Sequence, residues 1–304
     1  MGQLEFTGMI PPLISPLTRQ LELDKDALSR MVDHVIKHRV NAIFLLGSTG
    51  EWASLSPAFR GELMREGVKA VRGRIPVLAN LTANSLEEVR HNAEKAVLSG
   101  AAAGVLALPF YYRMEQTEAG RFLEQAADRS PLPLLLYNAP QYTGASLAPE
   151  TIGRLITHEK IIGIKDSSGD LHYMESIRQA ISGTETFLLA GPDQILPDAL
   201  QMGFDGGVCG GSNLFPGLYT AFIQAFREGN QAATADFQQM IGRIDREIFQ
   251  VSDSSLGFVI GLKYAMSLRG LCGDTMAMPV YGELKPEQKK SIQRLVEELT
   301  ESGY

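Results

Sequence analysis

The sequence predicts an α/β fold, a (β/α)8 TIM barrel with a C-terminal helical extension. Three observations lead to this fold. Short apolar runs alternate with longer amphipathic stretches, eight such pairs occur in succession, and they end near Glu228 in a chain of 304 residues. Apolar runs are typical of buried parallel strands, and amphipathic stretches of the helices that cover them. Eight units favour a barrel, because an open doubly wound sheet normally has about five or six strands.

Each predicted strand is a short apolar run, and each is followed by one predicted helix. The predicted strands are residues 9–16, 42–46, 76–81, 104–108, 133–138, 161–166, 187–191 and 206–210. The predicted helices are residues 24–38, 57–71, 85–100, 116–128, 148–158, 170–182, 194–202 and 215–228. Asp24, Ser56 and Ser85 stand where side chains cap helix N-termini, which gives three of these helices a defined start.

The chain is expected to consist of a catalytic barrel and a helical extension. We place the barrel in residues 1–229 and the extension in residues 230–304. The sequence has no evident internal repeat. Three further amphipathic stretches predict the helices of the extension: residues 232–251, 256–269 and 285–300.

Composition and charge exclude several classes of protein. Hydrophobic residues make up 44% of the chain, enough for a large core. The formal net charge of -7 and the lack of a basic cluster argue against nucleic acid as a partner. Two cysteines without metal-ligand spacing indicate a reducing compartment. Because no signal peptide or long apolar segment is recognisable, the sequence predicts a cytoplasmic protein without membrane contact.

Active sites of this fold lie at the C-terminal ends of the strands, where Lys165 stands out. This lysine follows the apolar run Ile161–Ile164, which predicts a buried strand. Burial of an ammonium lowers its pKa and supplies the neutral amine that attacks a carbonyl to form a Schiff base. The alternative is a structural lysine that pairs with Asp166 or extends to solvent.

Other polar residues at the strand ends suit the same chemistry. The loop Gly47–Glu51 offers backbone N–H groups and two hydroxyls for a carboxylate or phosphate, or is a glycine-rich turn without a ligand. Tyr137 could move a proton to and from the reacting oxygen, with Ser48 and Tyr111 carrying it onward; the alternative for each tyrosine is a packed ring.

No metal or cofactor is predicted. The five histidines all fall in or beside predicted helices and form no metal-binding pattern with carboxylates. Cys209 has no histidine at a neighbouring strand end and is expected to be inert. Carbon–carbon cleavage beside a carbonyl needs an electron sink, and we expect that sink to be an iminium on lysine.

Two motifs resemble those of the dihydrodipicolinate synthase and N-acetylneuraminate lyase family of pyruvate-dependent Schiff-base aldolases. The first is GSTGE at 47–51; the second is YNAP at 137–140 with Lys165, in GIKD, 28 residues after Tyr137. The resemblance covers essentially the whole chain. It implies that Lys165 forms the Schiff base, that Tyr137 transfers the proton, and that Ser48 links Tyr137 to Tyr111.

The resemblance also implies an assembly and a way to hold the ketoacid. In the family the relay tyrosine enters from a neighbouring subunit, so at least a dimer, and usually a homotetramer built from two dimers, is expected. Ser48 and Thr49 would hold the pyruvate carboxylate, and the backbone at Val208 would face the bound ketoacid.

Departures from the family motifs narrow the substrate class. Synthases resemble P-x-R-T-G after the tyrosine, but Tyr142 occupies the arginine position here. Of the motifs of sialic acid lyases only Asp193 is present. The chain therefore resembles the 2-keto-3-deoxy sugar acid aldolases and dehydratases, with four residues expected to bind substrate hydroxyls: Asn80, Tyr142, Asp193 and Ser212. Dihydrodipicolinate synthase, N-acetylneuraminate lyase, a dehydratase and a non-catalytic ketoacid-binding barrel remain alternatives.

Overall fold

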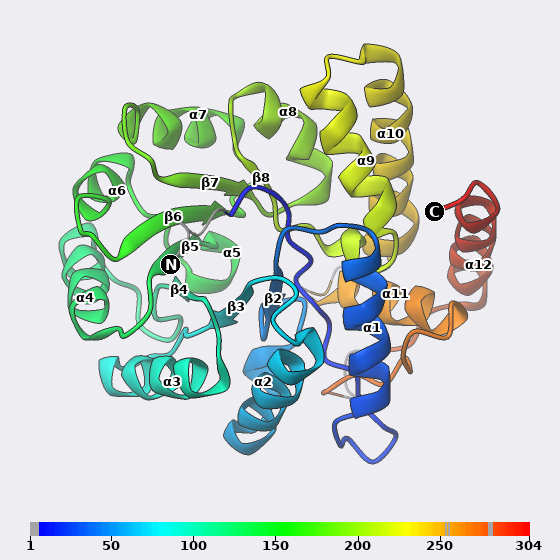
Figure 1. The fold of residues 1–304 in the computed structure, drawn as a ribbon, viewed down its shortest axis with the longest axis horizontal. Coiled ribbons are helices and arrows are strands. Elements are labelled where there is room, and N and C mark those ends of the chain that lie inside the picture. The colour runs from blue at the N-terminus through cyan, green and yellow to red at the C-terminus, as the bar shows by residue number, and fades with distance from the viewer. Residues whose placement is uncertain (1–5, 253, 255, 279–281) are drawn as a thin grey trace. The chain divides into compact units, whose positions relative to one another are not determined.

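The computed structural model describes residues 6–252, 254, 256–278 and 282–304. Along the chain its strands and helices alternate from β1 to α9, and further helices follow (Figure 1). This alternation is the connectivity of a (β/α)8 barrel. The chain forms two compact units. The first unit contains Pro76–Val208 together with Phe6 and Thr7, and the second contains Gly8–Ile75 and Cys209–Tyr304.

The first unit is built on a parallel sheet whose strands follow one another in chain order. Its strands are β3 (Val77–Asn80), β4 (Ala103–Ala107), β5 (Leu134–Asn138), β6 (Ile161–Asp166), β7 (Phe187–Ala190) and β8 (Gly206–Gly207). Almost every strand residue is buried. The strands are apolar throughout because side chains on both faces of such a sheet are covered.

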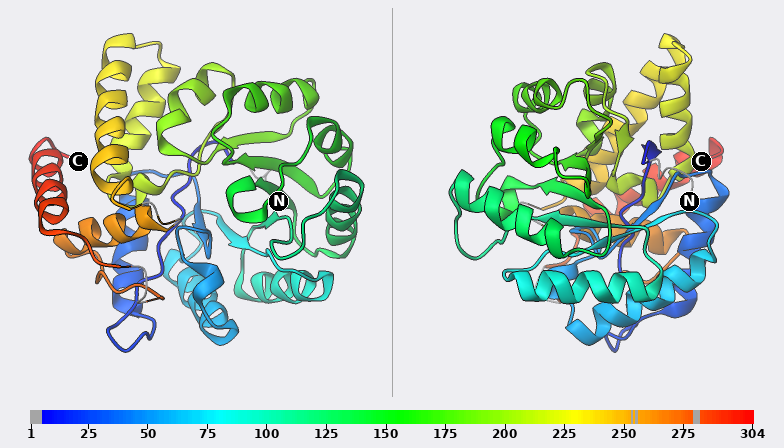
Figure 2. Two further views of the ribbon diagram at one scale, coloured as in Figure 1. Left: turned by 180° about the vertical axis from the view of Figure 1, so that it is seen from behind. Right: turned by 60° about the vertical axis from the view of Figure 1, so that its left-hand side comes forward.

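Helices connect the strands of this sheet, and all of them except the short α5 lie outside it in Figure 2. They are α3 (Leu86–Ser99), α4 (Gln116–Arg129), α5 (Pro140–Thr143), α6 (Pro149–Leu155), α7 (Leu171–Ala180) and α8 (Leu196–Gln201). The prediction of one helix per strand missed α5. Its single turn begins at Pro140, which suits the first helical position, and ends at Gly144, whose φ of 70° suits glycine.

The second unit begins with two short strands, β1 (Gly8–Met9) and β2 (Ile43–Leu45). The chain after β1 continues alongside β2, where the Leu13 N–H donates to the Phe44 carbonyl over 2.9 Å. The predicted strand 9–16 was too long because it contains prolines, which have no N–H for the ladder. The helices α1 (Lys25–Lys37), α2 (Pro57–Val71) and α9 (Pro216–Arg227) complete the predicted βα units.

The three predicted helix caps are confirmed. The Asp24 carboxylate accepts the Ala27 N–H at 2.9 Å, the Ser56 hydroxyl accepts that of Phe59 at 3.2 Å, and the Ser85 hydroxyl accepts that of Glu88 at 3.2 Å. Each bond satisfies an N–H that the first helical turn leaves without a partner. These caps fix where α1, α2 and α3 begin.

The C-terminal helices agree with the three predicted stretches. They are α10 (Gln231–Ile244), which continues into a π-helical turn (Asp245–Phe249), α11 (Gly257–Leu268) and α12 (Pro286–Glu301). The helices α9 and α10 belong to the same unit, and the domain boundary between residues 229 and 230 stays a prediction. Among the helices of the described residues, none has the length and apolar character needed to cross a bilayer.

Candidate active site

Lys165 and Tyr137 lie side by side at the ends of two neighbouring strands of the first unit. They form a register pair between β6 and β5, so both side chains leave the same face of the sheet. The Lys165 Nζ lies 4.1 Å from the centre of the Tyr137 ring. Lys165 is 5% exposed and Tyr137 is 7% exposed. This burial contradicts the alternative in which the lysine extends to solvent.

The next residue of each strand points to the opposite face and forms a second pair. The Asn138 Nδ2 donates to the Asp166 carboxylate over 2.7 Å, and the Ser168 hydroxyl donates to the other carboxylate oxygen over 2.7 Å. Asp166 is fully buried, which raises the pKa of its carboxyl although both hydrogen bonds act to lower it. These bonds hold the ends of β5 and β6 together behind Lys165 and Tyr137.

Tyr142 lies on α5, directly after the strand that carries Tyr137. Its side chain is partly exposed, and burial followed by the proximity of Tyr137 raises the pKa of its hydroxyl. Tyr142 therefore remains neutral at physiological pH and can donate a hydrogen bond. The structure brings three predicted site residues together in the first unit: Lys165, Tyr137 and Tyr142.

Tyr111 is exposed on the loop between β4 and α4. Its side chain is 74% exposed, and its ring stands edge-on to that of Tyr112 with 4.9 Å between the ring centres. The Asn84 side chain accepts the backbone N–H groups of Phe110 at 3.0 Å and Tyr111 at 3.2 Å. Asn84 thus fixes the loop that presents Tyr111, a role that the sequence analysis missed.

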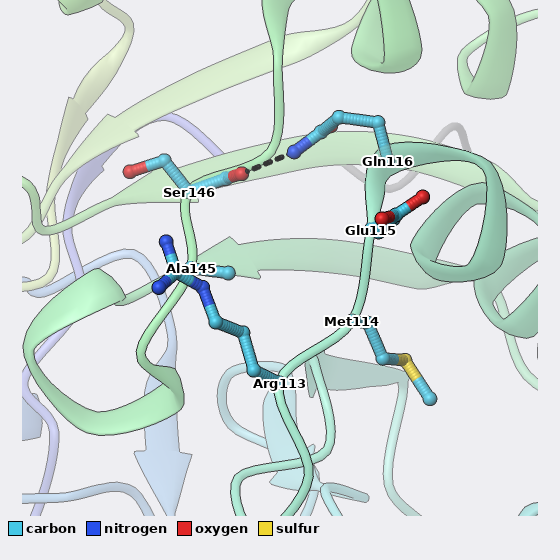
Figure 3. A pocket seen from close by; sticks show the side chains of 6 residues that line it. All are labelled: Arg113, Met114, Glu115, Gln116, Ala145 and Ser146. Carbon is cyan, nitrogen blue, oxygen red and sulfur yellow. Dashed lines mark hydrogen bonds between the residues drawn. The ribbon is translucent and has the colours of Figure 1, made fainter.

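A pocket of about 590 Å³ opens between this loop and the chain that follows α5 (Figure 3). Its lining residues are Arg113, Met114, Glu115, Gln116, Ala145 and Ser146. The Gln116 side chain donates to the Ser146 carbonyl over 2.8 Å and accepts the Ala148 N–H at 2.7 Å, which joins the two walls. The Arg113 side chain extends toward Ala145. The pocket therefore contains a cation from the β4–α4 loop that reaches toward the chain after α5.

The remaining predicted residues of the first unit lie at other strand ends. Asn80 ends β3, and its side chain accepts the Thr82 N–H at 3.1 Å. Asp193 is 5% exposed and begins the short 3-10 helix after β7. The buried Val208 follows β8, and its N–H donates to the Ala190 carbonyl over 2.7 Å. Their roles in substrate binding stay predictions.

The GSTGE loop belongs to the second unit and forms a tight turn after β2. The Gly50 N–H donates to the Gly47 carbonyl and the Glu51 N–H to the Ser48 carbonyl, each over 3.0 Å. The Ser15 hydroxyl donates to the Gly50 carbonyl over 2.6 Å. Thr49 is buried and Ser48 is half-buried. The proton relay from Tyr137 through Ser48 to Tyr111 stays a prediction, since Ser48 lies in the second unit and Tyr111 is exposed.

Three other residues of the second unit concern earlier predictions. Ser212 is fully buried, and its hydroxyl donates to the Cys209 carbonyl over 2.6 Å. Its donor is thus already engaged within the chain, and its predicted contact with substrate stays untested. Cys209 and Cys272 are both buried and neither is in a disulfide, and burial raises the pKa of Cys272 to about 12.

Glu51 forms a buried ion pair that the sequence analysis did not foresee. Its carboxylate faces the Lys263 ammonium from α11, and it also accepts the Ala277 N–H at 2.7 Å. Lys263 further donates to the Thr275 carbonyl over 2.7 Å. Burial lowers the pKa of Lys263, and the Glu51 charge opposes that shift. The sequence signal for this ion pair was Lys263 itself, a charged residue inside the apolar stretch 257–268.

Residues 5–299 match the model of the dihydrodipicolinate synthetase family, which is almost the whole chain. The chain belongs to the dihydrodipicolinate synthetase family. This result confirms the resemblance drawn from the two motifs. It also confirms the predicted enzyme class, that of the pyruvate-dependent aldolases and lyases.

Members of the family with known structures or names resemble the whole chain. A dihydrodipicolinate synthase structure from Bacteroides thetaiotaomicron has a TM-score of 0.91 and 34% identity, and covers 97% of this chain and 99% of that chain. The structure of Escherichia coli K12 YagE in complex with pyruvate has a TM-score of 0.90 and 29% identity, and covers 97% of this chain and 99% of that chain. The predicted barrel fold is thereby confirmed.

One curated relative carries the name of a sugar acid aldolase. It is the probable 2-dehydro-3-deoxy-D-pentonate aldolase YjhH of Escherichia coli K12, with 30% identity over 295 residues, 96% of this chain and 97% of the relative. A 4-hydroxy-tetrahydrodipicolinate synthase of Syntrophotalea carbinolica is 29% identical over 98% of both chains. The family therefore includes both substrate classes considered from the sequence.

Proposed function

We propose that this protein is a lysine Schiff-base aldolase or lyase that acts on a 2-keto-3-deoxy sugar acid. The observation that carries the proposal is the register pair of Tyr137 and Lys165, with the lysine buried and its Nζ over the tyrosine ring. A buried amine beside a phenol unites a carbonyl nucleophile with a proton donor at one strand edge.

In the proposed reaction the neutral Lys165 amine attacks the C2 carbonyl of the ketoacid. A C–N bond forms, the carbonyl oxygen takes up protons and leaves as water, and an iminium results. Tyr137 supplies and recovers a proton during these steps, because its strand position places it next to the amine. Ser48 links Tyr137 to Tyr111, which enters from a neighbouring subunit, as the family resemblance implies.

The iminium then serves as the electron sink for cleavage. Loss of the proton of the C4 hydroxyl lets the C3–C4 bond break, and its electron pair moves into the iminium to give an enamine and a free aldehyde. Protonation at C3 restores the iminium, and water releases pyruvate and the Lys165 amine. The same iminium activates C3–H for loss of a hydroxyl, so dehydration is the neighbouring reaction of the same site.

Recognition of the ketoacid carboxylate is assigned to the GSTGE loop. Its tight turn, with Thr49 buried and Ser48 half-buried, offers hydroxyl and backbone donors of the kind that bind anions. The Val208 backbone is proposed to face the same ligand. Hydroxyls of the sugar chain would meet Asn80, Asp193, Tyr142 and Ser212.

The neutral Tyr142 supports a neutral, hydroxylated second half of the substrate. Its raised pKa keeps the phenol uncharged, and a phenol can stack on a sugar chain but cannot neutralise a carboxylate. The name of the relative YjhH, a probable 2-dehydro-3-deoxy-D-pentonate aldolase, points to the same substrate class.

A 4-hydroxy-tetrahydrodipicolinate synthase is the second candidate. Relatives 29–31% identical to this chain carry that name, and the pocket beside α5 contains Arg113 as a cation. This candidate requires Arg113 to take the place of the arginine that Tyr142 replaces.

We also propose a homotetramer of two dimers and a cytoplasmic location. A tyrosine that enters a neighbour's site has to be exposed in the isolated chain, and Tyr111 is 74% exposed between two further exposed aromatic residues, Phe110 and Tyr112. Both cysteines are buried and neither is in a disulfide, which fits a reducing compartment.

Borohydride trapping tests the proposal. Incubation with pyruvate and sodium borohydride is expected to add one reduced adduct to the intact mass and to modify Lys165 in the peptide map. A panel of 2-keto-3-deoxy acids, with released pyruvate as the readout, then identifies the substrate. Absence of the adduct would favour a non-catalytic barrel, and efficient condensation with aspartate semialdehyde would favour the synthase.

A further inference from the structure

The GSTGE loop of the second unit is fastened at its last residue to the C-terminal extension. Glu51 and Lys263 are 2% and 0% exposed, so their ion pair is shielded from water. The other Glu51 carboxylate oxygen accepts the Ala277 N–H, and the Lys263 ammonium donates to the Thr275 carbonyl. Three segments thus meet at one pair of charges: the loop, α11 and the chain from residue 275 to 277.

The backbone conformation of Glu51 couples its side chain to the turn of the GSTGE loop. Glu51 has a φ of 53°, in the left-handed region that a residue other than glycine adopts at a cost. Its N–H closes the turn on the Ser48 carbonyl over 3.0 Å. The orientation of the Glu51 side chain is therefore linked directly to the backbone of Ser48 and Thr49.

Stability alone does not account for two charges at this place. Removing both ions from water is expensive, and apolar residues of similar size often support the folded state equally well. A buried pair with directional partners is better suited to fixing one arrangement of the segments it joins. Here both partners, the Ala277 N–H and the Thr275 carbonyl, lie in the extension, so the pair joins the loop residue Glu51 to that segment.

We propose that the Glu51–Lys263 pair is a positioning device that holds the GSTGE loop in the conformation that binds the ketoacid carboxylate. The inference rests on the proposed function of that loop. It makes the C-terminal extension a determinant of ketoacid affinity, although Glu51 and Lys263 are positioning residues and take no part in the chemical steps.

The test is the pyruvate concentration that gives half-maximal borohydride trapping. In Glu51→Gln/Lys263→Met no buried charge remains, so the fold is retained, but the directional contacts to residues 275–277 are weakened. We expect the half-saturating concentration to rise at least about tenfold, while saturating pyruvate still gives one adduct per chain. A tenfold change corresponds to about 1.4 kcal/mol of binding free energy.

A second variant changes one hydrogen bond only. Ala277→Pro removes the N–H that Glu51 accepts and leaves both charges in place, so a smaller rise in the half-saturating concentration is expected. The matched control is Arg243→Met in the extension, which removes ion pairs to Glu247 and Glu298 away from the loop. It is expected to lower the melting temperature without changing the half-saturating concentration.

The outcomes separate this inference from the proposed function. No adduct in the unmodified protein would refute the proposed function itself. If the unmodified protein is trapped and both loop variants, folded by circular dichroism, keep its half-saturating concentration, the positioning role is refuted. A double variant that cannot fold, combined with unchanged affinity in Ala277→Pro, would show that the pair serves folding instead.

Discussion

Tyr137 and Lys165 occupy paired positions on β5 and β6, and the Lys165 Nζ lies 4.1 Å from the centre of the Tyr137 ring. The amine is therefore close to the face of the ring, where a cation is stabilised by the aromatic quadrupole. The ring and the hydroxyl of Tyr137 thus have separable effects on the lysine. Substitutions that keep one and remove the other can distinguish them.

Lys165→Ala is expected to abolish turnover and borohydride trapping while the protein still folds. Removal of the amine eliminates the only group proposed to form the iminium. The measurement is the intact mass after pyruvate and borohydride, together with circular dichroism.

A lysine in the same unit provides the control for this substitution. Lys160 immediately precedes β6, and its ammonium donates to the Ser130 carbonyl over 2.6 Å. Lys160→Ala should retain the adduct and the activity. Trapping that persists in Lys165→Ala would remove Lys165 from the mechanism.

Tyr137→Phe is expected to bind the ketoacid and to form the imine roughly 10²–10⁴-fold more slowly, as for other general acid–base groups. The ring stays beneath the Lys165 Nζ, so the loss isolates the hydroxyl. Stopped-flow or quenched trapping gives the rate of imine formation. Tyr173→Phe is the control, because that hydroxyl donates to the Leu147 carbonyl over 2.6 Å and its loss should affect stability alone. An unchanged rate of imine formation in Tyr137→Phe would show that the Tyr137 hydroxyl takes no part in that step.

The sequence indicated the Lys165–Tyr137 pair through an apolar run that ends in a lysine and through the family motif that fixes its spacing from Tyr137. Neighbouring parallel strands bring their ends to the same edge of a sheet, so the two residues were expected to lie close together. The same 28-residue spacing joins Asn138 to Asp166, so the sequence also contains the signal for this second pair.

Other features depended on tertiary contacts that no local pattern encodes. The Glu51–Lys263 pair joins residues more than 200 positions apart, and only the folded chain places them together. The short helix α5 was missed because its four residues are too few for a periodic pattern, although Pro140 and Gly144 mark its ends.

Tyr111 is expected to complete the active site of a neighbouring subunit. Inactive Lys165→Ala and inactive Tyr111→Phe chains, mixed and allowed to exchange, should regain part of the activity, since one site of each mixed dimer contains both defects and the other contains neither. Native mass spectrometry establishes the exchange. If mixed dimers form and activity stays at the level of the separate variants, Tyr111 acts within its own chain or not at all.

Asp166 gives the stability a predictable dependence on pH. Burial raises its pKa above the ordinary value of 3.8, so the folded protein binds this proton more tightly than the unfolded chain. The stabilising contribution of Asp166 is therefore complete below pH 3.8 and is lost as the pH rises through the folded-state pKa.

The variant Asp166→Asn lacks this titration and keeps a group that can hydrogen-bond to Asn138 and Ser168. Unmodified protein should lose stability relative to the variant as the pH rises from 3.8, and the difference should become constant above the folded-state pKa. Melting temperatures of both proteins between about pH 3 and about pH 7 measure the difference. A difference that grows in the opposite direction would contradict the raised pKa.

Tyr142 is expected to determine which second substrate the site prefers. A phenol that burial keeps neutral cannot form the bidentate pair that a guanidinium makes with a carboxylate. Without that charge-assisted pair, worth about 2–3 kcal/mol, turnover of pyruvate with aspartate semialdehyde should be on the order of 10²-fold less efficient than turnover of a neutral-tailed 2-keto-3-deoxy acid.

Comparison of kcat/KM for the two substrates tests this preference, and Tyr142→Arg should narrow the gap by improving the semialdehyde reaction. Arg113→Ala is the accompanying variant, because Arg113 is the cation of the pocket beside α5. It should leave the preference of the unmodified protein unchanged. If the unmodified protein instead condenses aspartate semialdehyde efficiently and Arg113→Ala abolishes that reaction, then Arg113 replaces the missing arginine. The synthase would then be the correct function, because the carboxylate would have its cation from the β4–α4 loop instead of from α5.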